Sequence, residues 1–255
     1  MSSNTTVLIT GASRGIGQGF VETYLNLPNT TVVAAVRSAA SAEPLQALAK
    51  ASGSRLVVIE INVASFETIK QGIASLKSEH NIDSLDIVLA NAGSVNMSPK
   101  VAEFKIPSDI QPFVDANVYG QLELYNAVAP LLRKSNKTTK PKFMYMSSVV
   151  GSLTSMNNML ELSAYGASKA FGNFLFKWLS LEQQDIVLWA QHPGAVATAG
   201  AIESFPALKA KGIDPDLFFV SVEQACKSIL QIIDSATLEK THGKFLGPDG
   251  EEIPW

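Results

Sequence analysis

Three glycines near the start of the chain constrain its fold more than any other feature. Gly11, Gly15 and Gly17 follow an apolar run at residues 7–10 and precede a stretch of helical period at 18–27. A turn without side chains lets the backbone approach a phosphate closely, and the free N–H groups at the helix start face the anion. A glycine triplet can also be an ordinary turn, but its position between a strand and a helix favours a nucleotide-binding unit.

The rest of the chain repeats this alternation of short apolar runs and longer helical stretches, which is typical of a parallel sheet built from βα units. We expect an α/β fold of the Rossmann type, doubly wound, with a seven-stranded parallel sheet flanked by helices. The expected strands are residues 7–10, 31–36, 55–63, 86–90, 142–147, 186–190 and 244–246. No domain boundary is visible, so residues 1–255 are expected to form one dinucleotide-binding catalytic domain with a small substrate lid at about 199–215.

Two apolar stripes at helical spacing are expected to pack against this sheet as core. The first stripe is Ile69, Ile73 and Leu76, and the second is Phe171, Phe174, Leu175 and Trp178.

Charge and cysteine content exclude several classes of partner. The net charge is −3, and the 20 Lys and Arg residues are scattered, so neither nucleic acid nor a membrane is an expected partner. Cys226 is the only cysteine, which suits a reducing compartment. Because the chain does not start with a basic segment and a long apolar run, we expect a cytoplasmic protein. No His, Asp and Glu cluster predicts a metal site, and His192 is interpreted as packed or cofactor-adjacent rather than as a base.

The end of the second expected strand indicates which dinucleotide is preferred. An enzyme that prefers NAD often has Asp or Glu there to bind the ribose 2′-hydroxyl. This chain has Arg37 instead, and Arg14 in the glycine loop can approach the same group. Guanidinium groups match phosphate oxygens, so the sequence favours NADP, with two ordinary surface arginines as the alternative.

Tyr165 and Lys169 lie one helical turn apart and are the strongest candidates for chemistry. This spacing alone is unspecific, and the context carries the interpretation. Ser148 follows one strand and Pro193 follows the next, so both lie at the edge of the sheet that also holds the glycine loop. A free tyrosine has a pKa of about 10, so we expect the ammonium group of Lys169 to lower the pKa of Tyr165.

Together these motifs resemble the short-chain dehydrogenase/reductase family over essentially the whole chain. Residues 146–152 and 243–255 are similar to those of sniffer-type carbonyl reductases and fungal norsolorinic acid ketoreductase-like enzymes. The matching motifs are residues 10–17, residues 91–93, Asn117 in a helix, Ser148, Tyr165 with Lys169, and Pro193-Gly194 with Thr198.

The resemblance implies a role for each candidate. Tyr165 would donate a proton to a carbonyl as hydride arrives from the nicotinamide, and Ser148 would stabilise the charge on the substrate oxygen. Lys169 would also hold the nicotinamide ribose, and Asn117 would hold a water that links Lys169 to solvent. The expected cofactor-binding residues are Gly11, Ser13, Arg14, Gly15, Ile16, Gly17, Arg37, Asn62, Val63, Asn91, Ala92, Gly93, Tyr165, Lys169, Pro193, Val196 and Thr198.

Two departures from the family pattern bear on these roles. Asn62 stands where relatives commonly have Asp, so the adenine amino group would be bound by an amide oxygen without a charge. The interval from Ser148 to Tyr165 is several residues longer than in most relatives, which leaves Ser147 as an alternative to Ser148. Methionines in this interval either wall an apolar substrate pocket or pack as an ordinary loop.

The sequence therefore predicts NADPH-dependent reduction of an aldehyde or ketone, hydrophobic or aromatic, such as a secondary-metabolite ketone. One alternative is an NAD(P)-dependent alcohol dehydrogenase that works oxidatively. Another is a non-catalytic nucleotide-binding scaffold, which the intact catalytic set disfavours. By resemblance, helices around residues 109–132 and 163–181 would pair copies into a homodimer or homotetramer, with a monomer left open.

Overall fold

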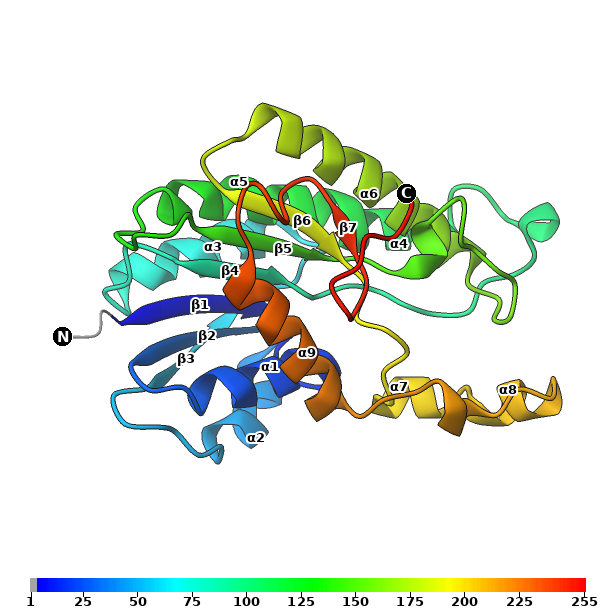
Figure 1. Ribbon diagram of the computed structural model, residues 1–255, viewed down its shortest axis with the longest axis horizontal. Helices are drawn as coiled ribbons and strands as arrows, with labels where there is room; N and C mark the ends of the chain where they lie inside the picture. The colour runs from blue at the N-terminus through cyan, green and yellow to red at the C-terminus, as the bar shows by residue number, and fades with distance from the viewer. Residues whose placement is uncertain (1–3) are drawn as a thin grey trace.

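The computed structural model describes residues 4–255, and in that part of the chain one sheet of seven parallel strands forms the centre of the molecule (Figure 1). Its order is β3-β2-β1-β4-β5-β6-β7, which confirms the predicted doubly wound fold. The order reverses between β1 and β4, the point at which open α/β sheets bind ligands. The strands are β1 (Thr5–Thr10), β2 (Thr30–Val36), β3 (Arg55–Glu60), β4 (Ile87–Ala90), β5 (Lys142–Met146), β6 (Val187–Gln191) and β7 (Phe245–Leu246).

Helices cover both faces of the sheet and create two cores (Figure 1). Successive side chains of a strand point to opposite faces, so Leu8 enters one core and its neighbours Val7 and Ile9 enter the other. One face carries α3 (Phe66–Ser78), α5 (Gly120–Leu132) and α6 (Ser163–Glu182), and the other carries α1 (Gly15–Leu25), α2 (Glu43–Gln46) and α9 (Val222–Ser235). Cys226 is fully buried on α9.

Shorter elements connect these layers. They are α4 (Gln111–Val114), the π-helical turn Asp115–Tyr119, α7 (Ala199–Ile202), α8 (Phe205–Ala210) and the 3-10 turns Ala39–Ala42, Val101–Glu103, Val149–Gly151 and Pro215–Leu217. The elements α7 and α8, in the segment predicted as a lid, extend away from the three layers (Figure 1). Within residues 4–255, none of the helices combines the length and apolar character that crossing a membrane requires.

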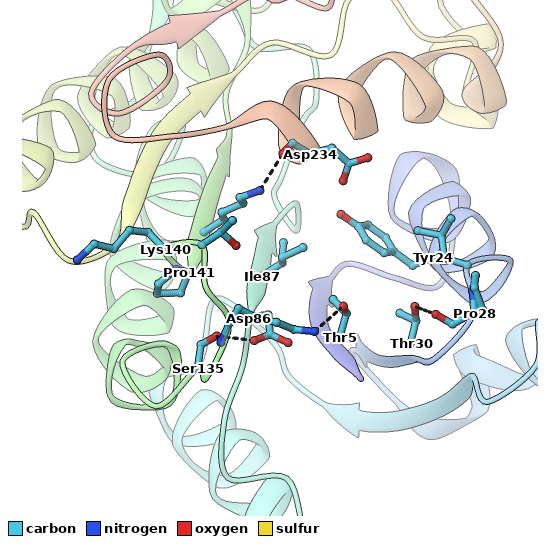
Figure 2. A pocket seen from close by; sticks show the side chains of 14 residues that line it. Thr5, Tyr24, Pro28, Thr30, Asp86, Ile87, Ser135, Lys140, Pro141 and Asp234 are labelled. Atoms are coloured by element: carbon cyan, nitrogen blue, oxygen red, sulfur yellow. Dashed lines mark hydrogen bonds between the residues drawn. The ribbon is translucent and has the colours of Figure 1, made fainter. Parts of the chain in front are cut away.

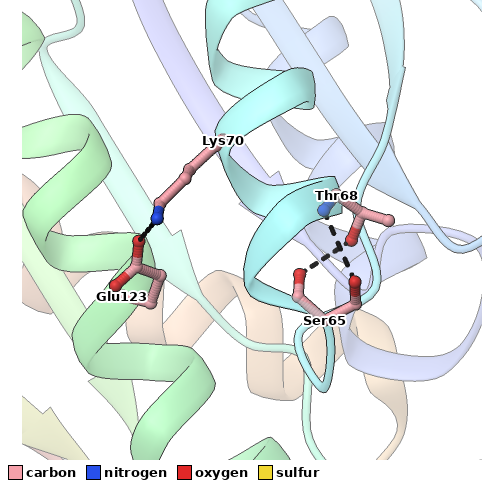
Figure 3. A network of polar contacts seen from close by, with 4 residues as sticks. All are labelled: Ser65, Thr68, Lys70 and Glu123. Atoms are coloured by element: carbon pink, nitrogen blue, oxygen red, sulfur yellow. Dashed lines mark hydrogen bonds and ion pairs between the residues drawn. The ribbon is translucent and has the colours of Figure 1, made fainter.

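The start of α3 fixes the turn that follows β3. The Ser65 hydroxyl caps the helix by accepting from the Thr68 N–H at 3.5 Å, and the Thr68 hydroxyl lies 3.0 Å from the Ser65 carbonyl (Figure 3). The same hydroxyl lies 3.0 Å from the carbonyl of Asn62 and accepts from the Asn62 N–H. Lys70 and Glu123 form an ion pair at 3.5 Å that joins α3 to α5 (Figure 3). The contacts with Thr68 hold Asn62, the predicted adenine contact, in the turn after β3.

The prediction for the second apolar stripe is wrong. Phe174 and Trp178 lie on the solvent side of α6, with 62% and 55% of their surfaces exposed, and Phe171 is exposed as well. Apart from Phe176, the helix instead buries small and polar residues, because it packs very close to the turn Val149–Gly151: a Cβ at Gly166 would lie 2.7 Å from the Val150 carbonyl oxygen. The first stripe, Ile69, Ile73 and Leu76, is buried as predicted.

Candidate active site

The glycine loop between β1 and α1 packs directly against the segment that follows β4. A Cβ at Gly17 would lie 2.2 Å from the carbonyl oxygen of Gly11, so the loop can close only with glycine there. The Asn91 amide donates to the Thr10 carbonyl at 2.9 Å, and the Ala92 N–H donates to the Thr10 hydroxyl at 3.0 Å. Two segments predicted separately as cofactor-binding are thereby held together.

The segment that follows β6 meets the same loop. Gly15 has a φ of +55°, and a Cβ on it would lie 3.2 Å from the Thr198 methyl group. Thr198 caps α7 by accepting from the Ala201 N–H at 3.2 Å, and Val196 is buried and pairs with Val220. The carboxyl ends of β1, β4 and β6 therefore converge on one place.

The predicted cofactor residues differ in how far solvent reaches them. Gly17, Val63, Lys169 and Val196 are buried, whereas Gly11, Ser13, Gly15, Ile16, Asn91, Ala92, Tyr165, Pro193 and Thr198 are half-buried. The exposed members are Arg14, Arg37, Asn62 and Gly93. Arg37 directly follows β2, and two residues later the Ala39 N–H donates to the Glu60 carboxylate at 2.6 Å. The Asn62 side-chain oxygen already accepts from the Ala64 N–H at 3.2 Å, which leaves one of its two lone pairs.

The two serines at the end of β5 have different partners. The Ser147 hydroxyl is buried and donates to the Asn173 side-chain oxygen on α6 at 2.5 Å. The Ser148 hydroxyl is half-buried and makes a hydrogen bond to the Tyr165 hydroxyl. Because the only proton of the Ser147 hydroxyl is directed to Asn173, the geometry favours Ser148 as the serine that faces a substrate.

Lys169 holds its amine in the interior, 4% exposed. The amine donates to the Met146 carbonyl of β5 at 2.7 Å and lies 5.6 Å from the centre of the Tyr165 ring. Burial lowers the pKa of Lys169 to about 7, because a charged group loses its hydration there. At neutral pH this amine is therefore divided between its charged and neutral forms.

The prediction that the pKa of Tyr165 is lowered is wrong for this structure, because the effect of burial is the larger one. Burial raises the pKa of Tyr165 to about 12, and the hydrogen bond from Ser148 opposes that change only in part. The amine of Lys169 turns toward the Met146 carbonyl, and its charge is itself weakened by burial. Tyr165 consequently keeps its proton at neutral pH, which is the form that a proton donor needs.

Asn117 lies in the π-helical turn between α4 and α5 and joins three parts of the site. Its side-chain nitrogen donates to the Ser94 carbonyl and to the Ser168 hydroxyl, each at 2.9 Å, and its side-chain oxygen accepts from the Ser94 N–H at 2.8 Å. A Cβ on Gly93 would lie 2.7 Å from the Asn117 oxygen and 3.8 Å from the Lys169 amine. The side chain of Asn117 thus ties the segment after β4 to the helix of Tyr165 and Lys169.

Sequence reasoning assigned no role to Tyr145, which the structure places in the same cluster. Its hydroxyl donates to the Asn117 backbone carbonyl at 3.0 Å. The available signal was a tyrosine in the middle of an otherwise apolar strand, because a buried tyrosine hydroxyl usually has a partner.

His192 agrees with its interpretation as a packed residue, since burial lowers its pKa to about 4 and keeps the ring neutral at pH 7.

Three loops at this edge of the sheet present apolar side chains to solvent. They carry Val95 and Met97 after β4, Leu153, Met156 and Met159 after β5, and Ile202, Leu217 and Phe218 after β6. The amine of Lys211 donates to the Met159 carbonyl at 2.9 Å, which joins the predicted lid to the long loop after β5. A pocket of about 290 Å³ lies elsewhere, among the starts of β1, β2, β4 and β5. Tyr24 and Asp234 are in its wall (Figure 2).

Comparisons with known proteins agree with this geometry. The family model described as short chain dehydrogenase matches residues 5–208. A short chain dehydrogenase of Penicillium aethiopicum, gsfK, is 47% identical over 98% of this chain and 99% of its own length. The norsolorinic acid ketoreductase of Aspergillus parasiticus is 32% identical over 98% of this chain and 91% of its own length.

Solved structures give the same result. An NADPH-bound carbonyl reductase from chicken fatty liver superimposes with a TM-score of 0.83 at 25% identity, and the carbonyl reductase Sniffer of Drosophila melanogaster with a TM-score of 0.81 at 25% identity. Each match covers 99% of this chain and 100% of the other. Motifs, topology and relatives all agree, and the chain belongs to the short-chain dehydrogenase/reductase family of oxidoreductases.

Proposed function

We propose that this protein reduces a hydrophobic aldehyde or ketone to the alcohol with NADPH. The observation that carries the proposal is the cluster at one edge of the sheet, where a protonated Tyr165 hydrogen-bonded by Ser148 lies beside the buried amine of Lys169. The glycine loop next to this cluster fits a dinucleotide, since glycine at position 17 lets the loop close tightly on the Gly11 carbonyl and leaves a turn with few side chains for a phosphate to approach. When bound, the nicotinamide supplies the hydride that attacks the carbonyl carbon.

Residues of the chain bind the substrate oxygen and supply its proton. Ser148 and Tyr165 hydrogen-bond the substrate oxygen and stabilise the charge that develops on it. The Tyr165 O–H bond breaks as the O–H bond of the alcohol forms, which leaves a phenolate. The ammonium form of Lys169 stabilises that phenolate until a proton from solvent restores the hydroxyl. The raised pKa of Tyr165 keeps its hydroxyl protonated at neutral pH, which is the form from which reduction starts.

Exposed arginines support NADPH as the cofactor. Arg14 and Arg37 are both exposed, one in the glycine loop and one directly after β2, where a 2′-phosphate of an adenosine ribose would lie. Replacing Arg37 by Asp should weaken NADPH binding by about ten- to a hundredfold and change NADH binding little. The ratio of the NADPH and NADH dissociation constants checks this prediction. An unchanged ratio would mean that Arg37 does not contact the cofactor.

Apolar loops support a hydrophobic substrate. Exposed apolar side chains from three loops surround the edge that holds Ser148 and Tyr165, and such surfaces mark binding sites for apolar ligands. The norsolorinic acid ketoreductases among the relatives are named for the reduction of a ketone, which is consistent with this chemistry.

The test is NADPH oxidation by the purified protein with a panel of carbonyl compounds, from small polar aldehydes to bulky aromatic ketones. We expect turnover to increase with the apolar size of the substrate and to be much lower with NADH. Turnover only of alcohols with NADP⁺ would indicate an oxidative dehydrogenase. NADPH binding without any turnover would indicate a scaffold protein.

We also propose that copies of the chain pair through α5 and α6. The aromatic side of α6, formed by Phe171, Phe174 and Trp178, is exposed, and Tyr119 next to α5 packs edge-on against Phe171 at 6.3 Å. Light scattering should give a dimer or tetramer for the wild type and a monomer for Phe174→Glu. A wild-type monomer at micromolar concentration would contradict the proposal.

A further inference from the structure

Tyr145 lies on β5 in the interior, between the helix of Lys169 and the turn of Asn117. None of its surface is exposed, and its ring stacks on the Phe176 ring with centres 4.4 Å apart. A side chain held this firmly presents two groups at fixed places. Its hydroxyl points to one member of the catalytic set, and the face of its ring lies against another.

The hydroxyl end is bound to the π-helical turn. Tyr145 donates to the Asn117 carbonyl at 3.0 Å, and no other side chain among the described residues is recorded as donating to that oxygen. The facing position on α6 is Gly172, where a Cβ would lie 2.2 Å from the Tyr145 oxygen and 2.8 Å from its ring carbon Cζ. Only glycine leaves room for this hydroxyl, so the helix and the strand are fitted to it.

The ring end is bound to the amine. The Nζ atom of Lys169 lies 4.9 Å from the centre of the Tyr145 ring while it donates to the carbonyl of the next residue, Met146. An ammonium group over an aromatic face is attracted by the negative charge of that face, most strongly where water is excluded. β5 therefore holds Lys169 by two neighbouring residues, once through a ring and once through a backbone oxygen.

We propose that Tyr145 is a positioning residue of the active site, whose ring holds the Lys169 ammonium beside Tyr165 and whose hydroxyl holds the Asn117 turn against the same cluster. The inference rests on the proposed function, because it gives Lys169 and Tyr165 the roles described above. Tyr145 joins two catalytic candidates that come from different helices, so it fixes their separation without touching the substrate.

A purely structural tyrosine of this chain serves as the control. Tyr24 is 2% exposed on α1, and its hydroxyl has no hydrogen-bond partner among residues 4–255. Tyr24→Phe makes the same chemical change as Tyr145→Phe at a buried site away from the carboxyl ends of the strands. We expect Tyr24→Phe to leave activity and its pH dependence unchanged.

The first experiment compares the pH profile of kcat for Tyr145→Phe and Tyr145→Leu. The titratable side chains that face Lys169 are Tyr145 and Tyr165, and its neighbours from other elements, Gly93 and Gly151, carry no charge. Reduction needs the ammonium form, so activity is lost as pH rises through the pKa of Lys169. Tyr145→Leu removes the ring and with it the attraction between ring and ammonium group. The alkaline limb of the profile, where kcat falls as pH rises, should therefore move about one pH unit lower. Tyr145→Phe keeps the ring and should keep the limb, with kcat lowered about three- to tenfold by the loss of the Asn117 hydrogen bond.

The second experiment uses Gly172. Gly172→Ala should lower both kcat and the melting temperature because its methyl group displaces the Tyr145 hydroxyl. The double variant Gly172→Ala, Tyr145→Phe should recover part of the melting temperature, because the closest atom is gone. A double variant no more stable than Gly172→Ala alone would contradict this account of the fit.

The outcomes separate this inference from the proposed function. An active wild type whose Tyr145→Leu variant keeps the wild-type limb and kcat overturns the inference alone. A wild type without any turnover overturns the proposed function. In that case NADPH affinity decides the inference: weaker binding in Tyr145→Leu than in Tyr145→Phe supports a ring that holds Lys169, and equal binding overturns it.

Discussion

The two edges of the sheet each contain a buried lysine near a tyrosine, yet only one edge is arranged for chemistry. At the carboxyl edge Lys169 lies beside Tyr165, and at the amino edge Lys142 lines a pocket with Tyr24 (Figure 2). Burial lowers the pKa of both lysines and raises the pKa of both tyrosines. Burial and a shifted pKa therefore do not distinguish a catalytic pair from a structural one.

The partners of each amine make the difference. Lys142 donates to the carbonyls of Ile233 and Asp234 at 2.6 and 3.3 Å, where it caps the end of α9, and its charge is further stabilised by the Asp234 carboxylate. Lys169 donates to a single carbonyl and otherwise faces two aromatic rings, with no carboxylate contributing to its pKa among the described residues. The first lysine completes a helix, and the second retains N–H groups that can serve a ligand.

Phenylalanine at the two tyrosines should sharpen this comparison most. We expect Tyr165→Phe to lower kcat by about 10²- to 10⁴-fold, because only the proton donor is removed, and to leave NADPH affinity close to wild type. Tyr24→Phe should change neither quantity, since its hydroxyl has no hydrogen-bond partner within residues 4–255. Steady-state kinetics and cofactor titration check both variants, and near-normal kcat in Tyr165→Phe would remove Tyr165 from the catalytic set.

Replacing Lys169 or Lys142 by alanine should have different effects, on activity for Lys169 and on stability for Lys142. Lys169→Ala should lower kcat about a hundredfold and weaken cofactor binding, because one amine is proposed to serve both Tyr165 and the ribose. Lys142→Ala should leave kcat intact and lower the free energy of unfolding by about 1.5–3 kcal/mol, the usual contribution of hydrogen bonds from a charged donor. If folded Lys142→Ala loses turnover and folded Lys169→Ala keeps it, the assignment of Lys169 to catalysis and Lys142 to structure is contradicted.

The pH dependence of stability provides a smaller effect of known sign. The pKa of Lys169 is about 7 in the folded protein and about 10.4 in an unfolded chain, so the unfolded state binds more protons between these values. Stability should therefore rise with pH from about 7 to about 10, by at most about 1.4 kcal/mol per pH unit from this residue. The raised pKa of Tyr165 acts in the opposite direction only above about pH 10.

Denaturant titrations of the wild type and Lys169→Ala across this range measure the effect. The wild type should show the rise, and Lys169→Ala should lack the part that Lys169 contributes. Parallel curves for the two proteins would mean that folding does not lower the pKa of Lys169.

Sequence patterns were sufficient for the fold and for most of the cluster. Each of the seven expected apolar runs overlaps a strand, because continuous buried runs between helical stretches are distinctive of parallel sheets. The glycine loop was recognisable from its place between one strand and one helix. The Tyr165–Lys169 spacing was unspecific by itself, and its context of strand ends at one edge of the sheet predicted that both residues lie with Ser148.

The errors arose where a single sequence does not specify packing. The stripe of Phe171, Phe174 and Trp178 predicted the wrong face of α6, because periodicity gives an apolar face but not whether that face covers the sheet. The buried face instead contains Gly172 and Asn173, which allow close approach to β5. Tyr145 was missed for the same reason, since its contact with Asn117 joins residues 28 positions apart.

The central claim is that the carboxyl edge of this sheet transfers hydride from NADPH to a carbonyl carbon. The direct measurement is the reaction of the wild type with NADPH carrying deuterium at the transferable position of the nicotinamide and a hydrophobic ketone, with mass analysis of the alcohol. We expect one deuterium on the carbinol carbon of the wild-type product and almost no alcohol from Tyr165→Phe. Alcohol without deuterium, or equal product from the two proteins, would contradict the account.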